Sequence, residues 1–291
     1  MARTLAQPAT LAAAHARPRK RDWHALTAHA ILLASVALLA FPLYYAFVIS
    51  TQTLSEVTTI PPKPWPSTAI IANYAEAWQR AHMARMLLNS AIVALGVALG
   101  KIVISMLSAF AIVYFDFRGK HVVFWMIFIT LMLPVPVRIV STYQVVSVLG
   151  WVNTYWGLTV PLMASATGTF LFRQFFRTIP DSLAEAAQLD GAGPMRFLWT
   201  ILLPLSKANI AALFVILFVY GWNDYLWPLM ITNTPDMRTA VIGIETLVPR
   251  TSQLPEWNVA MAAAMMVLLP PVAVIVAMQR WFMKGLIETE K

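Results

Sequence analysis

The chain has 291 residues, of which 59% are hydrophobic and only 12% are charged. This composition excludes an ordinary soluble domain and indicates a membrane protein in contact with lipid. Cysteine is absent, which excludes disulfide bridges, thiolate metal sites and cysteine nucleophiles. The formal net charge is +8, but five basic residues lie in the first 21 positions, directly before an apolar run. That placement is an orientation signal, so no nucleic-acid partner is expected.

Apolar runs of membrane length predict six transmembrane helices, because one helix needs about 20 apolar residues to cross a bilayer. The first run is longer than the core of a signal peptide and is therefore expected to remain as a helix. We predict an all-α polytopic membrane protein with a tail over 1–27, a transmembrane domain over 28–285 and a tail over 286–291. The six predicted spans are 28–49, 86–115, 121–140, 155–176, 207–231 and 259–283.

Basic residues set the expected orientation of these spans. With the N-terminus inside, fourteen Lys and Arg residues fall on the cytoplasmic side and six on the outer side. The positive-inside rule therefore predicts that both termini are cytoplasmic. The outer segment 50–85 has four prolines between 61 and 66, which predict an extended, ordered loop. This loop is either a spacer or a docking surface for an external protein, and the outer loop 232–258 is expected to be irregular as well.

The segment 180–194 predicts two short helices at the membrane surface. Ser182 and Glu185 have the spacing of a capping box at a helix start. Gly191 can adopt the left-handed conformation that ends a helix, and Pro194 suits the first turn of a second helix. Periodicity alone would make this segment an interfacial connector.

The residues of this loop resemble the EAA signature of ABC importer permeases. Glu185-Ala186-Ala187 is followed by Gly191 and then by Ile201-Leu202-Leu203-Pro204 at the spacing of that signature. In that family the loop, here about 178–206, forms a coupling helix that sits in a cleft of the ATPase subunit. The resemblance implies that the ATPase contacts lie on these residues: Glu185, Ala186, Ala187, Asp190 and Gly191.

The resemblance extends over nearly all of the chain after residue 28, to maltose-type carbohydrate permeases with a MetI-like core. The runs 124–134, 162–166, 169–176 and 220–228 are most similar to permeases of sn-glycerol-3-phosphate importers. The resemblance implies a permease subunit in the bacterial inner membrane that carries sn-glycerol 3-phosphate or glycerophosphodiesters by ATP-driven alternating access.

The same resemblance implies the partners of the chain. They are a second homologous permease, an ATP-binding cassette ATPase dimer and a periplasmic solute-binding protein. ATP would be used by the partner, with no cofactor bound by this chain. A neutral-sugar ABC importer and a stand-alone secondary transporter are the alternative functions.

Four polar residues within the predicted spans are candidates for the substrate pathway. Lys101 lies in the middle of the second span, where a charge costs roughly 2.5–3.5 kcal/mol on insertion. It either attracts an anionic phosphate or forms an interhelical salt bridge. Arg138, near the outer end of the third span, is suited to bind phosphate or to reach the membrane interface. Asn223 and Asp224 either line the pathway or hydrogen-bond across helices.

Motifs for catalysis are not found in the sequence. The five histidines lack metal-ligand spacing, and there is no paired-carboxylate pattern or serine-nucleophile turn. Neither a catalytic residue nor a metal is therefore expected. The sequence also lacks a nucleotide-binding motif, so ATP is expected to be hydrolysed by a partner subunit.

Overall fold

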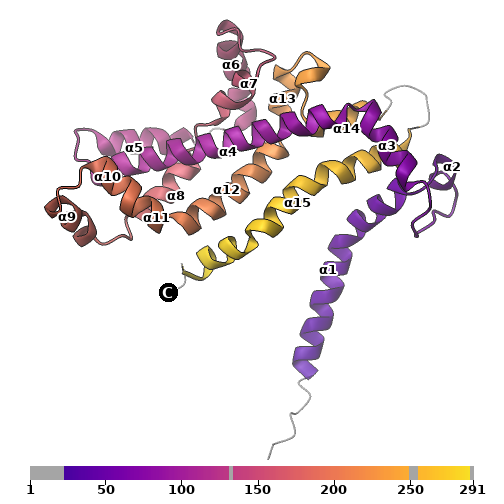
Figure 1. Cartoon of the computed structure of the whole chain (residues 1–291), viewed down its shortest axis with the longest axis horizontal. Coiled ribbons are helices and arrows are strands. Elements are labelled where there is room, and N and C mark those ends of the chain that lie inside the picture. Colours follow the sequence, from indigo (N-terminus) through magenta and orange to yellow (C-terminus); the bar gives the residue numbers. More distant parts are fainter. Residues whose placement is uncertain (1–22, 131–133, 249–254, 289–291) are drawn as a thin grey trace, which may run out of the picture. The chain divides into compact units, whose positions relative to one another are not determined.

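The computed structural model describes residues 23–130, 134–248 and 255–288 (Figure 1). Within these ranges the regular elements are all helical, as the composition predicts. Two compact units are distinguished, Met1–Tyr45 and Ala46–Lys291. The division between them falls inside the first helix, α1 (Trp23–Ser50).

Three helices in the described ranges are long and apolar enough to cross a membrane. They are α1, α4 (Met83–Tyr114) and α15 (Trp257–Glu288). A fourth candidate is the bent pair Pro194–Leu205 and Lys207–Trp222, whose two parts meet at 75°. The first, second and sixth predicted spans therefore correspond to single helices, whereas the predicted count of six is not confirmed.

The third and fourth predicted spans are each divided into shorter helices. Pro134 precedes one of these helices and Pro161 lies in a 3-10 turn, where the missing proline N–H interrupts helical hydrogen bonding. Residues 131–133, inside the third predicted span, lie outside the described residues. The pieces are α5 (Lys120–Ile129), α6 (Val135–Val148), α7 (Tyr155–Thr159), η2 (Val160–Leu162) and α8 (Ala166–Phe176).

The predicted fifth span is also interrupted, at residues 223–225. On its N-terminal side, a bent run of short helices carries Pro204 and leads into the span. The interruption matters for the site because it places polar residues between two apolar helices. The elements in order are α10 (Pro194–Phe197), η3 (Leu198–Leu202), α11 (Leu203–Leu205), α12 (Lys207–Trp222) and α13 (Leu226–Ile231).

The two segments predicted to be irregular contain helices that the prolines gave no reason to expect. The first holds α2 (Leu54–Val57) and α3 (Ile70–Arg80), and the second holds η4 (Pro235–Met237) and α14 (Ala240–Thr246). The expectation of irregular chain throughout was therefore wrong. Helix α3 buries Asn73 and Ala77 and packs against α15, so tertiary contacts stabilise it.

The proline segment itself is ordered, as predicted. The side-chain amide of Gln52 donates to the carbonyl oxygens of Lys63 and Trp65, at 2.9 and 3.1 Å. The Ser67 amide donates to the Thr51 hydroxyl at 2.9 Å. These bonds satisfy backbone groups of a segment that cannot form a helix.

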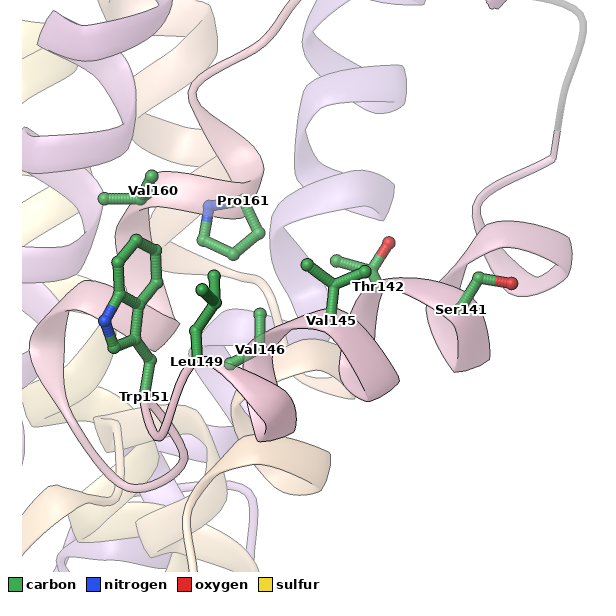
Figure 2. Close-up of a pocket in the computed structure, with 8 residues that line it drawn as sticks. All are labelled: Ser141, Thr142, Val145, Val146, Leu149, Trp151, Val160 and Pro161. Carbon is green, nitrogen blue, oxygen red and sulfur yellow. The ribbon is translucent and has the colours of Figure 1, made fainter.

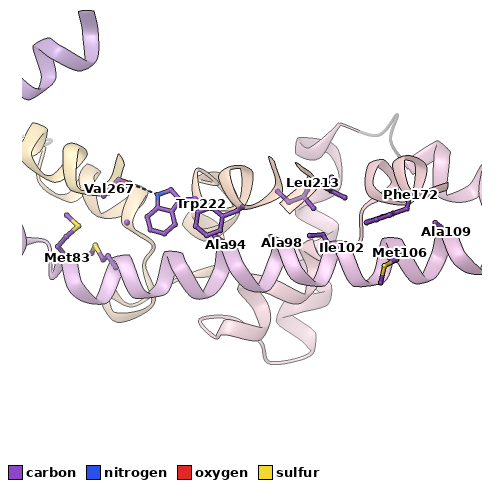
Figure 3. Packing of buried hydrophobic residues seen from close by; sticks show 14 of the residues in the cluster. Met83, Ala94, Ala98, Ile102, Met106, Ala109, Phe172, Leu213, Trp222 and Val267 are labelled. Atoms are coloured by element: carbon purple, nitrogen blue, oxygen red, sulfur yellow. Dashed lines mark hydrogen bonds between the residues drawn. The ribbon is translucent and has the colours of Figure 1, made fainter. Parts of the chain in front are cut away.

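Helix α4 is the axis of the larger unit, with α8 and α12 packed along it (Figure 3). Small residues allow the close approach. A Cβ on Gly221 of α12 would lie 3.3 Å from the Ala94 Cα of α4, and Ala98 is fully buried one turn further on. The Trp222 indole N–H donates to the Val267 carbonyl of α15 at 3.1 Å, so the bundle core joins α4, α12 and α15.

The glycines of α4 pack within this chain. A Cβ on Gly96 would lie 3.2 Å from the Thr159 side chain, and one on Gly100 would lie 2.4 Å from Cγ of Met163. This contact brings the chain after α7 against α4. The residue that follows Gly100 is Lys101, so the packing fixes the helix face on which the lysine lies.

Candidate functional site

A cavity of about 720 Å³ lies among α4, α5, α6, α8 and α12. Its volume is in the range of small-molecule sites. Most of its wall is apolar, with a few polar side chains on α4, α6, α8 and α12 and one at Thr130, directly after α5. These polar residues include Lys101, Ser108, Thr130, Arg138, Thr167 and Tyr220.

The structure brings Lys101 and Arg138 to this one cavity, although they lie on different helices and 37 positions apart in the sequence. The Lys101 ammonium lies over the Tyr220 ring, 4.8 Å from its centroid. Coulombic interaction links Lys101 with Arg138. Among the described residues, neither cation forms a salt bridge. An aromatic ring attracts a cation but does not pair with it as a carboxylate does, so both basic side chains reach the cavity without a salt-bridge partner among the described residues.

The other two candidates for the pathway, Asn223 and Asp224, lie between α12 and α13 and are not among the residues that line this cavity. The Asp224 carboxylate interacts electrostatically with the backbone amides of Trp227 and Leu226. It acts on Lys101 through a longer-range Coulombic attraction, without a salt bridge between the two.

Several hydroxyls at the cavity wall are used within the protein. Ser165 accepts from the Gly168 amide at 3.1 Å and so caps α8. Thr130 donates to the Ile127 carbonyl at 2.6 Å. Ser108 and Thr167 differ, because their hydroxyls have no hydrogen-bond partner among the described residues.

Sequence reasoning did not single out Ser108, Thr167 or Tyr220. Ser108 lies seven residues after Lys101, a spacing of two helical turns that places both on one face of α4. This seven-residue spacing was therefore a signal in the sequence that could have placed Ser108 on the same helix face as Lys101. Tyr220 lies in the aromatic run 220–228, and nothing in that run distinguishes the ring that contacts Lys101.

A second hollow of about 410 Å³ lies between α6 and the chain from 151 to 161 (Figure 2). Its wall is mainly apolar, with Val145, Leu149 and Trp151 facing Pro161. None of the described residues that line it is charged. An anion would therefore lose its hydration there without compensation, and the cavity at Lys101 is the better candidate site.

The predicted coupling loop forms α9 (Asp181–Leu189), followed by α10 as expected. The predicted capping box is wrong. The helix begins one residue before Ser182, its N-cap is Pro180, and no side chain caps it. Since Ser182 lies inside the helix, its spacing to Glu185 no longer has the geometry of the capping motif. Pro194 begins α10, as predicted.

The C-terminal end of α9 agrees with the prediction. Gly191 has a φ of +72°, and its amide donates to the Gln188 carbonyl at 3.0 Å. The Ala192 amide donates to the Ala187 carbonyl at 2.8 Å. These two bonds and the left-handed glycine form a Schellman motif, which fixes the direction in which the chain leaves α9.

Burial separates the five predicted ATPase contacts into two groups. Ala187 is 5% exposed and belongs to the bundle core together with Phe197. The others are exposed at the surface: Glu185, Ala186, Asp190 and Gly191. Leu189, which the sequence reasoning missed, is 90% exposed beside them.

Comparison with known families defines the class of protein. Residues 101–288 match the family described as binding-protein-dependent transport system inner membrane component. The match covers more than half of the chain, and the chain belongs to this family. It is therefore a permease of an ABC importer of the inner membrane, as the EAA resemblance predicted.

The similar relatives include several proteins called sn-glycerol-3-phosphate transport system permease protein UgpE. The chain is 53% identical to that of Rhizobium meliloti, over 94% of this chain and 99% of the relative. It is 55% identical to that of Agrobacterium fabrum, over 91% and 96%. The protein of Escherichia coli O1:K1 is 50% identical, over 93% and 99%.

A solved structure confirms the fold. The chain matches a subunit of a bacterial ABC transporter involved in the import of the acidic polysaccharide alginate, with a TM-score of 0.78. The alignment covers 91% of this chain and 99% of the other, at 19% identity. The predicted MetI-like, all-α permease fold is thereby confirmed.

Proposed function

We propose that this chain is the permease subunit of an importer for sn-glycerol 3-phosphate or glycerophosphodiesters. The observation that carries the proposal is the cavity with Lys101 and Arg138, two cations without a salt-bridge partner among the described residues. The name of the relatives, at 50–55% identity over nearly the whole chain, supports the same substrate.

The chemistry of the two side chains fits a phosphate ester. A phosphomonoester carries about −1.5 to −2 charges at neutral pH. Arginine binds phosphate through two parallel hydrogen bonds, whereas lysine acts as a point charge. Because the cavity is surrounded by apolar residues, these attractions are stronger than they would be in water. A neutral sugar would gain none of this energy.

The exposed end of α9 supports the proposed coupling to an ATPase. In this proposal Glu185, Ala186, Asp190 and Gly191 contact the ATPase, together with Leu189, and Ala187 holds α9 on the bundle. The ATPase dimer hydrolyses ATP, a second permease completes the pathway, and a periplasmic binding protein delivers the substrate. The chain itself carries out no catalysis, and both of its termini are cytoplasmic.

The proposal is tested by uptake of radiolabelled sn-glycerol 3-phosphate into proteoliposomes that contain the complete complex with its binding protein. We expect accumulation only with ATP at the ATPase side, competed by glycerophosphodiesters and not by maltose. Uptake of a neutral sugar in place of glycerol phosphate would support the alternative importer. Uptake without ATP would indicate a secondary transporter.

Removing either cavity cation is expected to weaken uptake in the same assay. We predict that Lys101→Ala and Arg138→Ala each lower glycerol-phosphate uptake about tenfold to a hundredfold, the size of one charge-assisted hydrogen bond. Lys120→Ala is the control, because Lys120 pairs with Asp116 at 3.0 Å and lies outside the cavity. Normal uptake by both cavity variants, in complexes with normal ATP hydrolysis, would contradict the role of the cavity.

A further inference from the structure

We infer that Ser108 is a substrate-binding residue that recognises a hydroxyl group of the cargo. The inference rests on the proposed function, which places an anionic substrate in the same cavity. It adds a second recognition element, for the polyol part of the substrate, at a distance from the cations.

The geometry of α4 separates the Lys101 ammonium from the Ser108 hydroxyl. Lys101, Ile104 and Ser108 all line the cavity, and their spacing of three and four residues places them on one face of the helix. Seven residues of helix rise by about 10 Å. Along α4, the cavity therefore presents the Lys101 side chain first and a hydroxyl two turns closer to the C-terminal end of the helix.

The state of the Ser108 hydroxyl distinguishes it from its neighbours. Ser105, one turn earlier, donates to the Ser165 carbonyl at 3.2 Å. A serine within a helix commonly bonds the carbonyl four residues before it, which for Ser108 is Ile104. No such bond is formed, and within the described part of the chain the Ser108 hydroxyl has no partner.

A half-buried hydroxyl without a partner gains most from a polar ligand group. Ser108 is partly buried at the cavity wall, so its contact with water is restricted. The hydroxyl can both donate and accept, which matches an alcohol group of the substrate. Thr167 of α8 also lines the cavity with an unused hydroxyl.

The positions of Lys101 and Ser108 along α4 determine how the substrate is oriented in the pathway. In the proposed topology α4 runs inward, so Lys101 lies nearer the outside and Ser108 nearer the cytoplasm. A phosphorylated polyol held by Lys101 and Arg138 then directs its hydroxyls inward, to Ser108. The cargo therefore passes this cavity with its polyol end first and its phosphate last.

The test compares Ser108→Thr with Ser108→Val, since these two side chains have the same shape and only threonine has a hydroxyl. Uptake of sn-glycerol 3-phosphate is measured in the complete proteoliposome complex, together with the ATP hydrolysis that its binding protein stimulates. We expect uptake by the valine variant to be about threefold to tenfold lower than by the threonine variant, which corresponds to one neutral hydrogen bond. ATP hydrolysis should be equal in the two variants.

Equal uptake by the two variants would overturn the inference, as would an equal loss of uptake and ATP hydrolysis, which would indicate a purely structural role. The proposed function is judged separately, on the wild-type complex. If the wild type carries a neutral sugar and not glycerol phosphate, the phosphate-last orientation is wrong. Uptake of that sugar by the threonine and valine variants then decides whether Ser108 binds a hydroxyl.

Discussion

Lys101 is stabilised by an aromatic ring in a position where a carboxylate would be the usual partner of a buried cation. Asp224 attracts Lys101 electrostatically, but among the described residues the two form no salt bridge. The Tyr220 face therefore compensates part of the cost of burying the ammonium. For single residues, the electrostatics of the site therefore depend on the group that contacts each charged side chain.

In contrast to Lys101, Glu56, in the segment between α1 and α3, has several direct hydrogen-bond donors at its charged group. The backbone amide of Thr53 donates to its carboxylate at 3.0 Å, and the Ser67 hydroxyl and the Lys63 ammonium each do so at 3.1 Å. These contacts, led by the Thr53 amide, lower the pKa of Glu56 from 4.5 to about 2. Glu56 is therefore ionised at neutral pH.

A pH dependence follows from this pKa. Because the folded pKa lies below the unfolded one, the stabilisation is complete above about pH 4.5 and is lost as the pH falls toward about 2. We predict that Glu56→Gln lowers the unfolding temperature at neutral pH. The difference from the wild type should shrink on acidification below about pH 4.5, which thermal unfolding at several pH values would measure. A difference independent of pH would contradict the assignment, and Glu76→Gln, which removes the exposed ion pair of Glu76 with Arg80 at 2.8 Å, controls for the loss of a surface ion pair.

At the scale of elements, α9 depends on how it ends. Its start has no side-chain cap, whereas its end has both bonds of a Schellman motif and a left-handed glycine. The direction of the chain into α10 is therefore set at Gly191. A short helix that transmits movement needs such a defined connection, because a flexible one would absorb the displacement.

We predict that Gly191→Ala weakens coupling whereas Gly193→Ala does not. Neither added Cβ would meet a neighbour within 4 Å, but Gly191 has a φ of +72° and Gly193 a φ of −68°. A left-handed conformation costs a residue with a Cβ about 1–2 kcal/mol. The affinity for the ATPase subunit should therefore fall about fivefold to thirtyfold in Gly191→Ala only. Equal affinities for the ATPase in a binding assay would show that this turn is not required.

The sequence predicted the existence of most elements but not their interruptions. Hydropathy averages over a window, so it joined α5 to α6 and α7 to α8 even though prolines at 134 and 161 marked the breaks. Helix α3 was missed because its stability depends on packing against α15, which no local pattern reveals.

The candidate site was predictable in part. Lys101 and Arg138 were identifiable singly, since a charge in an apolar span is unusual. Their meeting in one cavity depends on the tertiary arrangement of α4 and α6. Ser108 could not be distinguished from Ser105 by sequence, because the difference between them lies in the Ser165 carbonyl that only Ser105 contacts.

At the scale of the whole molecule, the proposed orientation can be measured directly because the chain has no cysteine. We predict that a cysteine at Thr59, an exposed residue after α2, reacts in intact cells with a membrane-impermeant maleimide. A cysteine at Gln188, exposed on α9, should react only after permeabilisation. Labelling of Gln188→Cys in intact cells would indicate the opposite orientation. The native chain, which has no cysteine, measures the background labelling.

In the proposed function, the two cavity cations also have a consequence for the empty carrier. Lys101 and Arg138 repel each other across the cavity when no anion lies between them. The Coulombic attraction of Asp224 on Lys101 opposes this repulsion. In the proposed function, a bound phosphate takes the place of a counterion between α4 and α6, and its departure leaves Lys101 with the longer-range attraction of Asp224 alone.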